Sequence, residues 1–153
     1  MAPSSSNNER VKFIYVNSTF DDIDEDDSSS QAGEIIIKGR LLPNSELYKN
    51  NSLPVDIILD AKYPMGHPKV KLSAALYHPN VDKEGNICIN LLTSRGWNSN
   101  TGIRDVIIAV TDIIDNPSQH DCAFAEAAAL LNSDKAAYER NALESYNKIC
   151  GPR

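Results

Sequence analysis

Cys88, one of three cysteines in the chain, follows a polar stretch in which no strand or helix period is evident. His78, Pro79 and Asn80 stand ahead of it. A thiolate is a strong nucleophile and a side-chain amide can stabilise an oxyanion, so this stretch could form an active site. Each residue also has a structural explanation: a cysteine as a small buried hydrophobe, a histidine as a hydrogen-bonded scaffold residue, an asparagine as a turn residue. Taken one by one, these residues leave both explanations open.

The connection that carries Cys88 runs from Tyr77 to Thr101 without periodic structure. Loops longer than about 15 residues in compact domains are usually functional or disordered. This loop contains many apolar and rigid residues, which predict that it is ordered and held on the core. Its "DKEGN" segment is typical of a tight turn and lacks the acidic pattern of a calcium loop. An ordered, irregular loop that bears a thiol is a candidate active site.

Three segments that could position this loop have the pattern of strands. "EIIIKGRLL" begins at Glu34 and ends before Pro43, and "LPVDIIL" from Leu53 places alternate apolar residues on one face. "KVKLSAAL" repeats that alternation as far as Leu76. Short polar links between such strands predict an antiparallel meander.

Helical patterns follow the loop. "IRDVIIAVTDII" has helical spacing, and the helix should stop at Asp115 because Asn116-Pro117 follows. "FAEAAALLN" predicts a short helix, and a last helix should run over residues 134–149 with Ser133 as its cap. Because strands come first and helices last, we expect an α+β domain.

The N-terminal third contains less regular segments. Residues 1–9 are expected to form a disordered tail, and the acidic, Ser-rich residues 21–33 an insert that buries no apolar surface. "RVKFIYV", from Arg10 to Val16, has strand composition, but its apolar residues also fit one helical face. Strand and helix both stay open here.

Composition narrows the function classes. The chain has 153 residues, which fits one domain, and a net charge of −6, which disfavours nucleic acid as a partner. Three cysteines without a CxxC pair argue against a disulfide framework and a zinc site. We expect no metal or cofactor and no membrane partner. Since "MAPSSSNNER" lacks the pattern of a signal peptide, we expect a cytoplasmic or nuclear location.

In combination, the motifs resemble the ubiquitin-conjugating enzyme family. "HPN", then "GNIC" after a short turn, then a tryptophan and a helix carry the resemblance. "YPMGHPKV" is similar to the family's tyrosine-proline loop, "DNPSQHDC" to its Asp-Pro turn, and "LPNSELYKNNS" to a strand-connecting turn. Residues 34–150 follow the family pattern, whereas residues 9–20 match its N-terminal helix weakly. The resemblance implies a single UBC domain over residues 10–150, with a four-stranded antiparallel meander and flanking helices.

The resemblance also implies the chemistry. Cys88 would accept the C-terminus of ubiquitin from an activating enzyme as a thioester and pass it to a lysine amine. A cysteine near its ordinary pKa supplies some thiolate at neutral pH, so no dedicated base is required. Asn80 would stabilise the oxyanion or, alternatively, brace the loop. Asp121 would orient and desolvate the incoming lysine.

The resemblance assigns supporting roles to further residues. His78, held next to Pro79, is expected to fix the loop rather than to act as a base. Tyr77 and Asp82 are expected to flank the channel to the thiol.

The same resemblance predicts binding surfaces. A RING- or HECT-type ligase would contact the loop with Pro64 and Met65 and the loop with Ser99 and Asn100. Substrate lysines of proteins would be the acceptors.

Two alternatives stay open beside ubiquitin transfer. The modifier could be a ubiquitin-like protein, which the sequence does not exclude. The chain could also be a non-catalytic ubiquitin-binding variant of the fold, but such a variant would lack Cys88.

Overall fold

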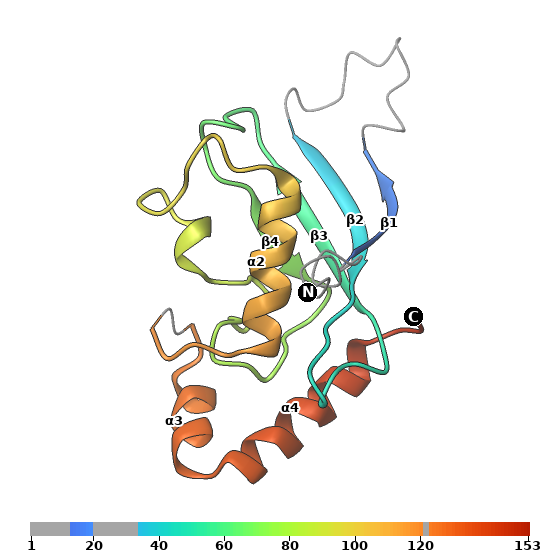
Figure 1. Cartoon of the computed structure of the whole chain (residues 1–153), viewed down its shortest axis with the longest axis vertical. Coiled ribbons are helices and arrows are strands. Elements are labelled where there is room, and N and C mark those ends of the chain that lie inside the picture. The colour runs from blue at the N-terminus through green and yellow to red at the C-terminus, as the bar shows by residue number, and fades with distance from the viewer. Residues whose placement is uncertain (1–12, 20–33, 121–122) are drawn as a thin grey trace, which may run out of the picture.

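A computed structural model describes residues 13–19, 34–120 and 123–153. These residues form a four-stranded antiparallel sheet in the order β1-β2-β3-β4, which is a simple meander (Figure 1). The strands are β1 (Phe13–Ser18), β2 (Ile35–Leu41), β3 (Leu53–Leu59) and β4 (Lys69–Leu72). The predicted α+β class and antiparallel meander are confirmed. The expected tail at 1–9 and the insert at 21–33 lie outside the described residues.

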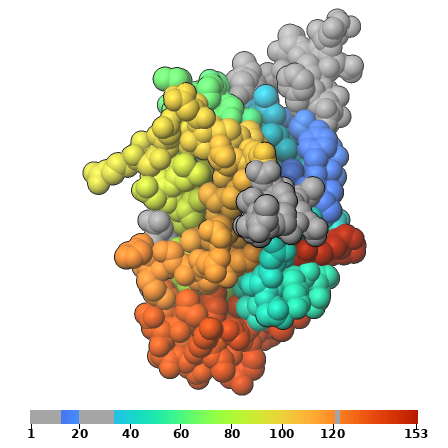
Figure 2. Space-filling model, in the orientation of Figure 1, coloured from blue at the N-terminus to red at the C-terminus, as the bar shows by residue number. Residues whose placement is uncertain are grey.

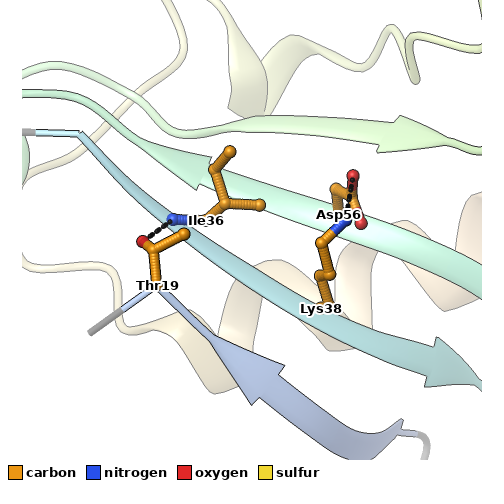
Figure 3. A network of polar contacts seen from close by, with 4 residues as sticks. All are labelled: Thr19, Ile36, Lys38 and Asp56. Atoms are coloured by element: carbon orange, nitrogen blue, oxygen red, sulfur yellow. Dashed lines mark hydrogen bonds and ion pairs between the residues drawn. The ribbon is translucent and has the colours of Figure 1, made fainter. Parts of the chain in front are cut away.

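Alternation in β3 separates a buried face of the sheet from a more exposed one. Leu53, Val55, Ile57 and Leu59 are buried, while the residues between them are only half-buried. Ile57 is the centre of this face, paired with Ile37 on β2 and Val70 on β4. The other face carries a cross-strand ion pair between Lys38 and Asp56 at 3.4 Å (Figure 3). Because that pair is largely exposed, the apolar face contributes most of the stability.

Residues 13–18, for which strand and helix both remained open, form a strand. Phe13 pairs with Leu41, and its ring lies against Gly39, where any larger side chain would collide with it. The register shifts between Tyr15 and Asn17. At the end of β1, Thr19 accepts a hydrogen bond at Oγ1 from the Ile36 N–H (Figure 3). These residues therefore do not supply the N-terminal helix of the resembled family, because pairing with β2 satisfies their backbone instead.

The helices follow the sheet in the chain. They are the 3₁₀ helix η1 (Asn90–Leu92), α2 (Ile103–Asp115), α3 (Ala125–Ser133) and α4 (Lys135–Ile149). Figure 1 shows α2 lying across the sheet and α3 and α4 grouped at one end of the molecule. Val106, Val110 and Ile114 of α2 join the buried strand residues in one core. None of the helices in the described ranges has the length and apolar content to cross a membrane.

Two expected boundaries are wrong. Strand β4 ends at Leu72 rather than at Leu76, because its pairing with β3 ends at Leu72, opposite Val55 and close to the start of β3. Residues 85–87 pair with its outer edge: the Leu72 N–H donates to the Gly85 carbonyl, and the Ile87 N–H to the Val70 carbonyl. Ser133 ends α3 and does not cap α4. The cap is Asp134, whose carboxylate accepts from the Ala137 N–H at 3.1 Å.

The two faces of β3 give a stability prediction. Ile57→Ala should lower the free energy of unfolding by about 2–5 kcal/mol, since it removes a fully buried side chain from a packed core. The neighbouring Ile58→Ala is the matched control, because Ile58 is only half-buried on the opposite face. It should cost no more than about half as much. Chemical denaturation of both variants measures the difference, and equal losses would contradict the assignment of the two faces.

Candidate active site

Residues 80–88 form a small irregular hairpin that brings Asn80 and Cys88 side by side. The Cys88 N–H donates to the Asn80 carbonyl at 2.8 Å, Val81 and Ile87 form an isolated bridge, and the Asp82 N–H donates to the Asn86 carbonyl at 3.0 Å. Gly85 closes the turn with a φ of 91°, which side-chain-bearing residues rarely adopt. Backbone hydrogen bonds thus bring Asn80 and Cys88, which are eight positions apart in the sequence, next to each other.

The Asp82 carboxylate organises this turn. Its Oδ1 accepts from the backbone N–H groups of Glu84 and Asn86, and its Oδ2 from the Asn86 side chain. Partial burial would raise the pKa of Asp82, but hydrogen bonds from Asn86, Glu84 and Gly85 outweigh it and hold the pKa below its usual value. Asp82 also lines a cleft of about 460 Å³ together with residues 123–126. This cleft is not the cavity that Cys88 lines, so the expected place of Asp82 beside a channel to the thiol stays a prediction, and its carboxylate is engaged in the turn.

His78 is completely buried and both of its ring nitrogens are engaged. Its Nε2 lies 2.9 Å from the Ile113 carbonyl and 3.3 Å from that of Ile114, and its Nδ1 accepts from the Asn80 N–H at 3.0 Å. This pattern requires a neutral ring with its proton on Nε2. Burial lowers the pKa of His78 to about 4, although the two carbonyls and Asp115 oppose the shift. The imidazole is therefore uncharged at neutral pH and links the loop to the end of α2.

Pro79 and Tyr77 link the loop to the last two helices. The buried Pro79 offers its carbonyl to the N–H groups of Ala123, at 2.8 Å, and Phe124, at 3.1 Å. The Tyr77 ring packs edge-on against Phe124, with 5.3 Å between centroids, and its N–H donates to Ser145 Oγ on α4. Tyr77 thus lies in the wall between the loop and the helices.

Asn80 is buried, and its side chain reaches a different loop. Its Oδ1 accepts from the Ser118 N–H at 2.9 Å. Ser118 belongs to the "DNPSQHDC" turn, so this bond joins the two motifs that the sequence placed at one site. Asp121 of the same turn lies outside the described residues, as does Cys122.

Cys88 differs from the residues on either side of it. Ile87 and Ile89 are buried, whereas Cys88 is half-buried, with its Sγ 3.8 Å from the Asn86 carbonyl. The residue lines a cavity of about 290 Å³, together with His67, Val70 and Leu92 among others. Its sulfur-bearing side chain is thus partly exposed at this cavity, unlike its two buried neighbours. Sequence reasoning missed His67 in this wall, because only folding of the "YPMGHP" segment brings it near.

The two loops expected to bind a ligase are tied to each other. The Trp97 Nε1 donates to the Pro64 carbonyl at 2.7 Å, and the Trp97 ring lies beside Tyr63. Pro64 follows a cis peptide bond, and Met65 is 77% exposed. Ser99 and Asn100, in the second loop, are exposed as well. No sequence pattern indicates the Trp97 contact, which ties the two loops together.

Among residues 13–19, 34–120 and 123–153, no group of three or more His, Cys, Asp or Glu side chains could hold a metal ion. The partly exposed thiol of Cys88 lies on a loop that is fixed mainly by backbone hydrogen bonds.

An α+β meander that carries a partly exposed thiol beside a His-Pro-Asn segment is typical of one class of protein, the ubiquitin-conjugating enzymes. Comparison with known proteins gives the same class. The family model described as "Ubiquitin-conjugating enzyme" matches residues 14–146. The chain belongs to the ubiquitin-conjugating enzyme family.

Individual relatives are moderately similar. A probable ubiquitin-conjugating enzyme, E2 L460, of Acanthamoeba polyphaga mimivirus is 35% identical over 70% of this chain and 66% of its own length. Ubiquitin-conjugating enzyme E2 ubc-18 of Caenorhabditis elegans is 31% identical over 71% of each chain. The NEDD8-conjugating enzyme ubc12 of Schizosaccharomyces pombe is 33% identical over 63% of this chain and 54% of its own length.

The buried, neutral His78 gives a pH prediction. Between pH 6.5 and about 4 the unfolded chain binds a proton at this residue that the folded chain does not, so stability should fall as the pH falls through this range. The contribution amounts to about 3 kcal/mol at most. Denaturation of wild type and His78→Gln at a series of pH values measures it.

His120→Gln is the control, since His120 is exposed. We expect His78→Gln to be less stable at pH 7 and to show a flatter pH dependence, while the control keeps the wild-type slope. If the free energy of unfolding of His78→Gln depended on pH as steeply as that of wild type, His78 would have the same pKa in the folded and the unfolded chain.

Proposed function

We propose that this chain is a ubiquitin-conjugating enzyme that carries ubiquitin as a thioester on Cys88 and transfers it to a lysine amine. One observation carries the proposal: a half-buried thiol stands at the open side of a rigid loop in a chain of this family. A non-catalytic ubiquitin-binding module is the weaker candidate, because its function would not need an accessible cysteine. We also propose a cytoplasmic or nuclear location; of the cysteines in the described residues, Cys88 and Cys150 are both free thiols.

The first step is an exchange of thioesters. The Cys88 thiolate attacks the carbonyl carbon of the thioester on the activating enzyme, a new C–S bond forms, and the enzyme's thiolate leaves. His78 is a poor base for this step. Its pKa of about 4 makes it a weak proton acceptor, and hydrogen bonds already engage both of its ring nitrogens. Thiolate present at neutral pH suffices.

In the second step a lysine amine attacks the carbonyl carbon of the Cys88 thioester and negative charge develops on the carbonyl oxygen. The tetrahedral intermediate then collapses, so that the new C–N bond remains, the C–S bond breaks and the Cys88 thiolate leaves. A well-placed amide donor stabilises such an oxyanion by about 3 kcal/mol. Asn80 is the proposed donor, while its bond to Ser118 supports a second role in bracing the loop. Lysine has a reference pKa of about 10.4, so the amine must lose a proton before it attacks. Asp121 is proposed to orient and desolvate it.

The proposed cargo and partners are supported by membership of the family. Relatives named for ubiquitin and for NEDD8 both match this chain, so a ubiquitin-like modifier is the alternative cargo. An activating enzyme would deliver the modifier. A RING- or HECT-type ligase is proposed to bind the joined surface of Pro64, Met65, Ser99 and Asn100, where exposed Met65 offers an adaptable apolar contact.

Charging of Cys88 tests the proposal directly. With ATP, an activating enzyme and ubiquitin, the protein should gain one ubiquitin in a band that a reducing agent removes. Cys88→Ala should abolish the band, and Cys88→Ser should give a reductant-resistant ester. Cys150→Ala is the matched control, since Cys150 is also half-buried but lies after α4, and it should charge normally. A thioester band that persists in Cys88→Ala would sink the assignment, and a parallel series with other modifiers identifies the cargo.

Discharge of the thioester separates the two roles of Asn80. Asn80→Ala and Asp121→Ala should slow transfer to free lysine by at least about tenfold while charging changes little, because the amine attacks only in the second step. The exposed Asn100→Ala is the control and should behave like wild type without a ligase. Equal slowing of charging and discharge would indicate that Asn80 only maintains the loop.

A further inference from the structure

The segment that carries Cys88 runs antiparallel to the outer edge of β4. Lys71 and Asn86 form a bridge between the two, flanked by backbone hydrogen bonds at 2.8 and 3.0 Å. Continued by two residues, this register places Lys69 opposite Cys88. Directly opposite residues of an antiparallel pair have Cβ atoms about 5 Å apart. Lys69 and Cys88 also line the same cavity of about 290 Å³, so Lys69 is the cross-strand neighbour of the thiol.

Alternating burial assigns these two side chains to the same side of their segments. On β4 the even-numbered residues are buried, whereas Lys69 and Lys71 are exposed. The two lysines belong to the face of the sheet that α2, in gold in Figure 2, leaves uncovered. On the opposite segment Ile87 and Ile89 are buried, whereas Cys88 is half-buried. Both segments therefore turn their more exposed side chains to the same side, and the thiol is one of them.

The wall of the cavity beside Cys88 contains an ammonium group and, among the described residues, no carboxylate. Its ionisable members besides the thiol are Lys69 and His67. The Nδ1 of His67 lies 2.9 Å from the carbonyl of Pro68. In the part of the chain that the structure describes, no carboxylate lies within ion-pair distance of Lys69. The charge of Lys69 is therefore not offset by any of these residues.

Other charged groups near the thiol are paired or line another cleft. Lys71 lies opposite Asp56, whose carboxylate also binds Lys38 at 3.4 Å. The cleft of about 460 Å³ on the hairpin is mainly acidic, and its charged residues are Asp82, Lys83, Glu84 and Glu126. Around the end of α2, the Asp115 carboxylate accepts two backbone N–H groups, and His120 is exposed. Lys69 is thus the cation placed to act on the sulfur.

We propose that the Lys69 ammonium stabilises the thiolate of Cys88 and so sets the share of nucleophilic sulfur at neutral pH. A positive charge beside a thiol favours its ionised form. Lys69 acts through Cys88 and is therefore a positioning residue. Its use in catalysis rests on the proposed transfer, in which it would favour both the thiolate that attacks and the thiolate that leaves when the C–S bond breaks.

Alkylation of Cys88 in the full chain measures this effect without ubiquitin. The thiolate attacks the methylene carbon of iodoacetamide, a C–S bond forms and iodide leaves. Mass spectrometry of the peptide that contains Cys88 gives the rate from about pH 6 to pH 10. Lys69→Met should slow the reaction about threefold at pH 7 and move the midpoint of the pH profile up by about half a unit, as expected for one charge about 7 Å away in water. Lys69→Arg keeps the charge and should react like wild type.

Iodoacetate, the anionic analogue, gives a second readout of the same charge. The ratio of its rate to that of iodoacetamide should fall in Lys69→Met, and added salt should lower the wild-type ratio towards that of the variant. Lys83→Met is the matched control, because it removes a lysine of the same hairpin that lies outside the cavity. It should leave both the midpoint and the ratio close to wild type.

Three results would overturn the proposal. Lys69→Met could keep the wild-type midpoint and ratio, Lys83→Met could change them as much, or the effect of Lys69→Met could vanish in a His67→Gln background, which would assign it to the imidazole. The test is independent of charging with ubiquitin. If the alkylation results hold but wild type is not charged, the transfer reaction is wrong and the effect of Lys69 on the thiol stands.

Discussion

The buried imidazole of His78 is the contact on which the geometry of the site depends. The last carbonyls of a helix have no partner within the helix, and here Nε2 satisfies the carbonyl of Ile113 near the end of α2. The other nitrogen accepts the backbone N–H of Asn80. One neutral ring thus satisfies a helix end and a loop at once. Any side chain that could not both donate and accept would leave a buried polar group unmet, at a cost of about 1–3 kcal/mol.

Backbone groups supply further anchors of the loop. On the sheet side, Gly85 and Ile87 pair with the outer edge of β4, which protects that edge and fixes the hairpin. On the helix side, the Pro79 carbonyl receives two N–H groups from the segment that leads into α3. The hairpin therefore spans the sheet and the helical end of the molecule. The hairpin is irregular because it bonds both to the edge of β4 and to the segment that leads into α3, which run in different directions. A straight strand could not bond to both.

Periodicity predicted the elements whose patterns are local. The alternation of Leu53–Leu59 and the Asn116-Pro117 stop gave β3 and the end of α2 as the structure has them. Motif resemblance selected Cys88 and Asn80, which the structure places side by side. Non-local pairing decided the rest: residues 13–18 fit two periods until β2 supplied a partner, and β4 ends at Leu72, where its pairing with β3 ends. The carbonyl and N–H groups that hold the site carry no side-chain signal, so a sequence could not reveal them.

Cys88 is held in the loop by its backbone, and this has a consequence for the chemistry. Its N–H is bound by Asn80, while its sulfur lies at a cavity and only 3.8 Å from a carbonyl oxygen, a weak contact. If Cys88 carries a thioester as proposed, acylation of its sulfur would break none of the backbone bonds that hold the loop. The thiol and the proposed thioester would then share one hydrogen-bonded scaffold, so the orientation needed for the second reaction would already be present when the first is complete.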